Sequence, residues 1–256
     1  MDRESIAIKL RENDIPFPEK LPEKLETYFQ LLLEWNTRMD LVAGAGETEL
    51  LDRHMTDSLT VLRTDLLEGC STLIDVGTGA GFPGMVLAMA IPGMQVTLLD
   101  SQRKRLDFLR EVMDRTRTEN VTLLHARAED GARRKDLRER FDAAAARAVA
   151  PLNTLCEYLL PYVRVGGRAL CWKGPALAQE REAGRRAAFL LGGRLGDPIQ
   201  MPIAGRDWEH VILPVDKISK TPASYPRKAG TPKSKPLAEQ TLRPAAEQTT
   251  EKEETE

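Results

Sequence analysis

The sequence predicts an α/β fold with a largely parallel, doubly wound sheet, an antiparallel final strand and an N-terminal helical cap. Short apolar segments alternate with amphipathic ones from Thr72 onward, which is typical of βαβ units. A glycine-rich turn at 75–84 joins the first strand to a helix that opens at Pro83. The last two predicted strands have no helix between them, so we expect them to pair antiparallel.

Residues 1–65 are predicted to form the helical cap. Leu25, Tyr28, Phe29, Leu32 and Leu33 follow the i, i+3, i+4, i+7, i+8 spacing of an amphipathic helix. A second helix is expected from about 48 to 63, again with one apolar side. The apolar stripe of the first helix needs a partner.

Residues 66–216 are predicted to form the sheet domain, with ligands at the carboxyl ends of its strands. Residues 217–256 are rich in Pro, Lys, Ser and Thr, and we expect them to form a poorly ordered tail that is basic and then acidic. The strands are expected at 72–76, 96–100, 121–125, 141–148, 167–173, 195–203 and 210–215, with helices after Pro83 and at 104–114, 152–160 and 177–191.

The composition is that of a soluble globular protein, with 41% hydrophobic and 30% charged residues in 256. No apolar run reaches the ~18 residues of a membrane span, and no signal peptide opens the sequence, so we expect a cytoplasmic protein without a membrane partner. Cys70, Cys156 and Cys171 are widely separated and have no histidine at ligand spacing. We therefore expect reduced thiols and no metal site.

The net charge of −2 hides a strong segregation of charge. Residues up to about Cys70 are acid-rich, and the stretch 103–140 is base-rich. The stretch 217–235 carries six basic side chains and no acidic one. Local basic patches would therefore have to provide any affinity for nucleic acid.

The glycine-rich turn is compatible with two cofactors. Gly79-x-Gly81-x-x-Gly84 satisfies the dinucleotide fingerprint, and Asp100, at the end of the next strand, supplies the acid that holds a ribose. Asp75, however, is awkward beside a pyrophosphate and suits a cofactor that carries an ammonium and a sulfonium. The resulting Asp-x-Gly-x-Gly-x-Gly pattern resembles motif I of the S-adenosylmethionine (SAM) methyltransferases.

Several further blocks resemble one family, the bacterial 16S ribosomal RNA guanine-N7 methyltransferases known as GidB or RsmG. The resemblance covers about 21–237, with departures at Met39-Asp40-Leu41-Val42 and at Ala146. The matching blocks are Leu33-Glu34-Trp35-Asn36, Arg53-His54-Met55-Thr56-Asp57-Ser58-Leu59, the turn 75–84, Leu98-Leu99-Asp100-Ser101 with Lys104-Arg105 and Phe108-Leu109, Arg127-Ala128-Glu129, Arg147-Ala148-Val149-Ala150-Pro151-Leu152, Lys173-Gly174 and the segment 221–232.

The resemblance implies a class I, Rossmann-like methyltransferase fold and the transfer of a methyl group from SAM to N7 of a guanine in 16S ribosomal RNA. The partner is then 16S ribosomal RNA or the small ribosomal subunit, and the protein is expected to be a monomer. N7 has a free lone pair and loses no proton, so no general base is assigned and catalysis rests on orientation.

The resemblance also implies the site residues. Arg147 is expected to position the cofactor or the guanine, as a residue of both the catalytic and the cofactor site. The remaining cofactor contacts are expected at Gly77, Gly79, Phe82, Asp100, Ala128 and Glu129, and contacts to RNA at Lys173, Arg227 and Lys228.

Two alternatives of other classes stay open from the sequence. A nicotinamide-dependent oxidoreductase would use the same glycine fingerprint, although Asp75 and the antiparallel ending argue against it. A non-catalytic RNA-binding assembly factor could retain the whole fold without activity.

Overall fold

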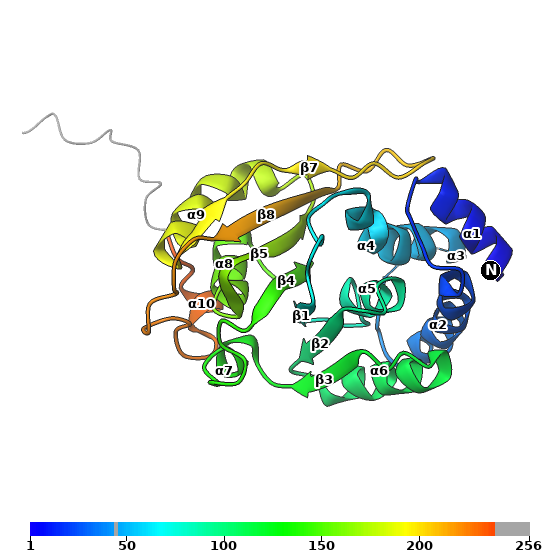
Figure 1. Ribbon diagram of the computed structural model, residues 1–256, viewed down its shortest axis with the longest axis horizontal. Helices are drawn as coiled ribbons and strands as arrows, with labels where there is room; N and C mark the ends of the chain where they lie inside the picture. The colour runs from blue at the N-terminus through cyan, green and yellow to red at the C-terminus, as the bar shows by residue number, and fades with distance from the viewer. Residues whose placement is uncertain (44–45, 239–256) are drawn as a thin grey trace, which may run out of the picture.

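A computed structural model describes residues 1–43 and 46–238 (Figure 1). Its sheet has the strand order β3-β2-β1-β4-β5-β8-β6, and β7 pairs with β8 off this path. The strands are β1 (Thr72–Val76), β2 (Gln95–Asp100), β3 (Val121–His125), β4 (Phe141–Arg147), β5 (Val163–Lys173), β6 (Gly193–Leu195), β7 (Ile199–Gln200) and β8 (Val211–Lys217).

The pairing confirms the predicted sheet. β1 to β5 are parallel to one another, whereas β8 runs antiparallel to β5 and to β6. The strand expected at 195–203 is instead two short strands, because Pro198 between them has no N–H to donate to a ladder. β8 lies between β5 and β6, so the chain returns into the sheet beside β5.

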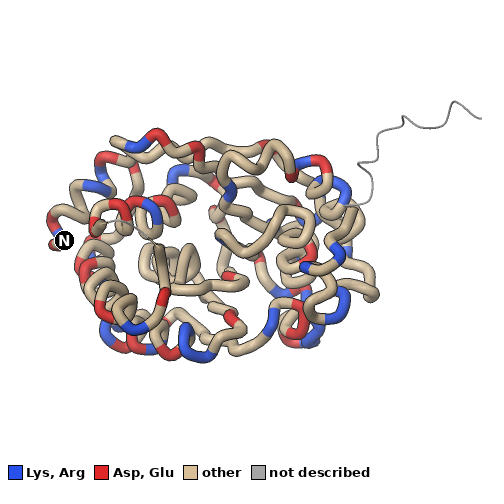
Figure 2. The backbone as a smooth tube through the Cα atoms, turned by 180° about the vertical axis from the view of Figure 1, so that it is seen from behind, with Lys and Arg blue, Asp and Glu red and all other residues tan. Residues whose placement is uncertain are grey.

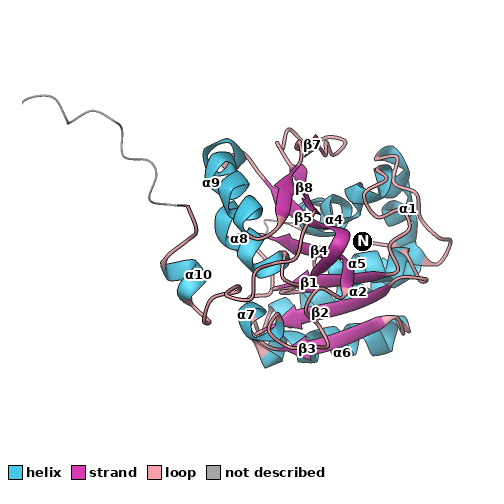
Figure 3. Cartoon of the chain, turned by 60° about the vertical axis from the view of Figure 1, so that its left-hand side comes forward, coloured by secondary structure: helices cyan, strands magenta, loops and turns pink. Residues whose placement is uncertain are grey.

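Helices cover both faces of the sheet (Figures 1 and 3). The cap helices lie with α5 and α6 on one face, and α8 and α9 lie on the other. The helices are α1 (Arg3–Glu12), α2 (Leu21–Asn36), α3 (Glu47–Leu50), η1 (Leu51–Thr56), α4 (Asp57–Leu59), η2 (Thr60–Arg63), α5 (Gly84–Ala90), α6 (Arg103–Thr116), α7 (Ala128–Gly131), α8 (Leu152–Leu159), α9 (Leu177–Leu190) and α10 (Thr231–Ser234).

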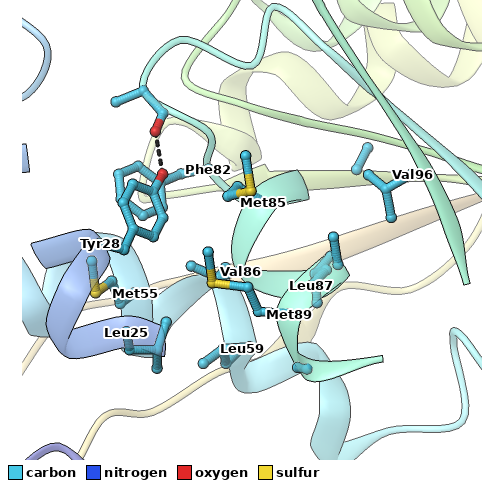
Figure 4. Close-up of a cluster of buried hydrophobic side chains, with 14 of the residues drawn as sticks. Leu25, Tyr28, Met55, Leu59, Phe82, Met85, Val86, Leu87, Met89 and Val96 are labelled. Carbon is cyan, nitrogen blue, oxygen red and sulfur yellow. Dashed lines mark hydrogen bonds between the residues drawn. The ribbon is translucent and has the colours of Figure 1, made fainter. Parts of the chain in front are cut away.

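The cap shares its core with the sheet domain. Leu25 and Tyr28 of α2 and Met55 of η1 are buried in the same cluster as Met85 and Val86 of α5 (Figure 4). The hydroxyl of Tyr28 donates to the carbonyl of Ala80, in the glycine-rich turn (Figure 4). Packing of the cap therefore supports the turn directly.

The helix expected at 48–63 is broken into four pieces. Its central part, η1, is a π-helix, and such turns insert an extra residue and concentrate at functional sites. Helix α1 was not predicted, although Asp2 caps it by accepting a hydrogen bond from Ser5 N at 2.9 Å.

The described part of the tail, 217–238, is packed, which corrects the prediction that it is poorly ordered. Lys217 is 1% exposed, and its ammonium donates to the carbonyl of Leu160 at 2.8 Å. Pro232 and Leu237 are buried as well. Basic and acidic positions are interspersed in this half of the molecule, opposite the N-terminus (Figure 2). The predicted acidic end, 239–256, lies outside the described residues.

Candidate active site

Asp75, in β1, holds the glycine-rich turn from within. Its Oδ2 accepts hydrogen bonds from Thr78 Oγ1 at 2.6 Å and from Gly84 N at 2.9 Å. Burial raises the pKa of this carboxyl to about 6. The sequence suggested that Asp75 suits a cationic cofactor, but the side chain is completely buried, so its role is to shape the turn.

The turn brings bare backbone to the carboxyl edge of the sheet. Gly77 and Gly79 have φ values of +75° and +60°, a region that side-chain-bearing residues rarely occupy. A Cβ on Gly77 would lie 3.0 Å from Val149 Cγ2. Gly79 N donates to Asp100 Oδ2 at 2.9 Å, which joins the turn to the end of β2.

The first cavity lies beside this turn and has a volume of about 310 Å³. Gly77, Asp100, Ala128 and Glu129 line it, which brings four of the predicted cofactor residues together. Asp100 is 2% exposed, and its Oδ1 also accepts from Gln102 N at 2.8 Å. A carboxylate offers about four acceptor positions. Gly79 N, Gln102 N and Arg105 Nη1 occupy three of them, so Asp100 retains one for a hydroxyl group of a ligand.

Phe82 lies outside the lining of both cavities described here, which separates it from the other predicted cofactor residues. Its ring is 5% exposed and stacks against Tyr28 and His54, at centroid distances of 5.5 and 5.3 Å. The guanidinium of Arg147 lies over the same ring at 5.5 Å. The Phe82 ring therefore packs against one face of the Arg147 guanidinium.

A second cavity, of about 450 Å³, adjoins the first. Its charged and ionisable lining consists of Arg53, His54, Asp57, Arg147, Lys173, Glu180 and His210. Ala148 lines both cavities and has a φ of +55°, which is a strained value for a residue with a Cβ. The two cavities therefore meet at the end of β4.

Arg147 is held by three groups of the cap. Its Nη1 donates to Asp57 Oδ2 at 3.1 Å and to the carbonyl of Arg53, and its Nη2 donates to Nδ1 of His54. The other carboxylate oxygen, Asp57 Oδ1, lies 2.8 Å from His210 Nδ1. These contacts fix the guanidinium plane at the wall of the second cavity.

His54 and Asp57 are site residues that sequence reasoning did not assign. Burial and the adjacent Arg147 guanidinium lower the pKa of His54 to about 4, so the imidazole is neutral near pH 7. Both residues lie in the Arg53–Leu59 block that matches the family. The sequence alone does not indicate which residues a single histidine contacts. The π-helix places both side chains beside β4.

The three predicted RNA contacts have different environments. Lys173 lines the second cavity and pairs with Glu180 at 2.5 Å. Arg227 instead pairs with the buried Glu157 at 2.6 Å, so its guanidinium is occupied within the fold. Lys228 is exposed. Within the described residues, there is no cluster of three or more metal-ligating side chains.

The strand order, the glycine-rich turn and the strand-end Asp100 define a SAM-dependent methyltransferase. The chain belongs to the GidB family, rRNA small subunit methyltransferase G, whose model matches residues 21–200. The nicotinamide alternative is therefore not favoured.

Curated relatives match most of the chain. The ribosomal RNA small subunit methyltransferase G of Alkaliphilus oremlandii is 45% identical over 214 residues, which cover 84% of this chain and 90% of that protein. The protein of the same name from Leuconostoc citreum is 42% identical over 240 residues, covering 93% and 100%. A Haloferax volcanii complex of a methyltransferase activator, Trm112, with a putative methyltransferase shares the fold, with a TM-score of 0.51 and 16% identity over 67% of this chain and 93% of that one.

The first cavity fits SAM chemically. Because position 77 is a glycine, no side chain crowds the space between the turn and Val149. Asp100 provides a carboxylate that can accept a hydrogen bond from a ribose hydroxyl. In the described part of the chain, no helix is long and apolar enough to cross a membrane.

Proposed function

We propose that this protein transfers a methyl group from SAM to N7 of a guanine in 16S ribosomal RNA. The observation that carries this proposal is the junction of the two cavities at Ala148. A cofactor in the smaller cavity and a base in the larger one would meet at the end of β4. The larger cavity has the size of an ordinary small-molecule site.

The residues around the larger cavity are suited to positioning a guanine. Arg147 is held on several sides, and a fixed guanidinium is a common partner of the guanine O6 acceptor beside N7. Lys173 extends the same wall and offers an ammonium to a phosphate. Orientation of this kind lowers the barrier by placing the reacting atoms before the reaction begins.

The proposed reaction needs no general base. Guanine N7 attacks through a free lone pair and releases no proton. His54 is neutral, but its Nδ1 lone pair already accepts from Arg147, so it is not available as a base. SAM supplies an activated methyl group when bound, and the chain supplies orientation.

The experiment that tests the proposal is methylation of ribosomal RNA with labelled SAM and mapping of the modified base. Naked 16S ribosomal RNA, assembled small subunits and assembly intermediates are compared as substrates. We expect one modified guanine, with the label at N7. A protein that binds RNA and transfers no label to any of the three would instead be the non-catalytic assembly factor.

We further propose that the protein acts as a monomer in the cytoplasm, where ribosomal RNA and SAM meet. The two described cavities are lined by residues of a single chain, which supports a site that is complete in one copy. Light scattering after size exclusion checks the oligomeric state, and fractionation of cells checks the location.

A further inference from the structure

The C-terminal segment 227–237 reaches the first cavity. Gly230 and Lys233 line it together with Gly77, Asp100 and Glu129. These two residues come from a part of the chain that follows the last strand by more than ten positions. The cavity therefore has one wall that does not belong to the sheet or to its connecting loops.

An ion pair between the half-buried Arg227 and a buried carboxylate holds the start of this segment. Glu157 of α8 is fully buried, and its Oε1 accepts from Arg227 N at 2.7 Å and from Arg227 Nε at 3.0 Å. Its Oε2 accepts from Arg227 Nη2 at 2.6 Å. Such a bidentate pair fixes both the side chain and the backbone at Arg227.

Three further hydrogen bonds hold the rest of the segment. Gly230 N donates to Glu129 Oε1 at 2.8 Å, at the cavity itself. Thr154 Oγ1 donates to the carbonyl of Pro232 at 3.1 Å. Asn153 Nδ2 donates to the carbonyl of Leu237 at 2.7 Å. All these anchors lie on α7 and α8, so the segment spans the cavity between fixed points.

The first cavity is lined by three cations, Arg105, Arg127 and Lys233. Arg105 is paired with Asp100 at 3.4 Å, whereas Arg127 and Lys233 have no ion-pair partner among the described residues, and of these two only Lys233 belongs to the C-terminal segment. Its ammonium carries three donors and no acceptor. SAM presents one carboxylate together with hydroxyl and ring-nitrogen acceptors, so this cofactor can satisfy a free ammonium.

We propose that 227–237 is an integral wall of the cofactor site and that Lys233 donates a hydrogen bond to the bound cofactor. The proposal rests on SAM as the cofactor. It gives Glu129 a second role, because its carboxylate anchors the wall as well as lining the cavity. The sequence assigned this basic segment to RNA. In the proposal, Gly230 and Lys233 face the cofactor, whereas Lys228 stays exposed.

The first test measures binding of S-adenosylhomocysteine by calorimetry, without RNA or turnover. We expect Lys233→Ala to weaken binding about 5-fold or more, the loss of one hydrogen bond from a charged donor. Lys235→Ala is the matched control, since Lys235 is exposed on the same segment and outside the cavity lining, and its affinity should equal that of the wild type.

A second ligand, 5′-methylthioadenosine, locates the contact. It lacks the amino-acid part, so a defect of Lys233→Ala that disappears with this ligand places the ammonium at the carboxylate. A defect seen with both ligands places it at the nucleoside. Unchanged affinity for S-adenosylhomocysteine in Lys233→Ala would overturn the proposal.

The third measurement is limited trypsin digestion of the wild-type protein. Cleavage at Lys228–Ala229 and Lys233–Ser234 requires the segment to leave its anchors, and a ligand that needs the closed segment suppresses that opening by 1 + [L]/Kd. At a ligand concentration of 100 Kd we expect cleavage of both bonds to slow up to about 100-fold. Arg38–Met39, in an exposed turn after α2, is the control bond and should be cleaved at an unchanged rate.

Equal cleavage at 228–229 with and without S-adenosylhomocysteine would also overturn the proposal. Failure of the wild-type protein to bind S-adenosylhomocysteine at all would instead count against the assigned cofactor and the proposed function. The two failures are therefore distinguishable.

Discussion

Arg147 donates a hydrogen bond to Nδ1 of His54, which fixes the imidazole as a neutral ring protonated on Nε2. That Nε2 lies 3.2 Å from the carbonyl of Ala43, where a donor is required. The relationship joins the end of β4 to the π-helix of the cap. The cap therefore holds the Arg147 guanidinium in place.

Replacement of Arg147 should impair methyl transfer more than folding. Arg147→Ala leaves the buried Asp57 with His210 as its remaining partner, and the free energy of unfolding should fall by at most about 3–5 kcal/mol. Arg147→Lys should restore part of that stability but not the transfer rate, because an ammonium lacks the planar fork. Single-turnover methylation and melting are measured on both variants.

Arg164→Ala is the control for Arg147, since it also loses an Arg–Asp pair, with Asp142 at 2.6 Å, at an exposed position. Its transfer rate should equal that of the wild type. Normal single-turnover transfer by Arg147→Ala would remove Arg147 from the site and leave it a purely structural role.

Asp100→Ala should weaken binding of SAM by about 1–3 kcal/mol, because hydrogen bonds to a charged acceptor are lost. Asp100 also fixes the turn through Gly79 N, which adds to the effect. Calorimetry with one site per chain checks this value. Asp107→Ala, at an exposed position of α6, should bind normally. Equal affinities of the two variants would contradict the assignment of Asp100.

Strands were predictable from the sequence because their signal is local. β1 and β3 have the predicted bounds, and β2 differs by one residue, since apolar runs and the glycine-rich turn delimit each strand. Because the strands were predictable, the residues at their carboxyl ends were predictable too. Gly77, Asp100, Ala128 and Glu129 line one cavity at that edge of the sheet.

The C-terminal segment was not predictable, because its order comes from distant partners. Its composition favours disorder, yet Glu157 and Glu129 anchor Arg227 and Gly230 from positions 70 and 101 residues away. The packing of Phe82 was not predictable for a related reason, because its ring stacks on Tyr28 and His54, which belong to the cap. Local pattern carries no information on such contacts.

Lys228 should contact an RNA phosphate, since it is exposed and follows Arg227, whose guanidinium is paired with the buried Glu157. Lys228→Ala should reduce the log–log slope of RNA affinity against salt by about 0.7–0.9. Filter binding at several salt concentrations measures the slope. Lys20→Ala, at an exposed position before α2, should leave it unchanged. A slope that is the same in Lys228→Ala and the wild type would exclude this contact, whereas truncation of the segment is uninformative because it removes Arg227.

His54 should make the stability of the fold depend on pH between about 6.5 and 4. Burial and Arg147 lower its pKa from 6.5 to about 4, so in this range the unfolded chain binds more protons than the folded one. The stabilisation is complete above pH 6.5 and is lost as the pH falls through 4. A shift of this size corresponds to about 3 kcal/mol.

Asp75 has the opposite dependence, because burial raises its pKa from 3.8 to about 6 and its protonation in the fold adds stability as the pH falls through that range. The two residues therefore offset each other in the wild-type protein. His54→Asn removes one of them while its amide oxygen can still accept from Arg147. We expect His54→Asn to be less stable than the wild type at pH 7, and the difference in unfolding free energy to shrink by up to about 3 kcal/mol at pH 4. Urea titrations at pH 7, 6, 5 and 4 measure both curves, and curves that stay parallel over this range would show that burial and Arg147 do not hold His54 neutral.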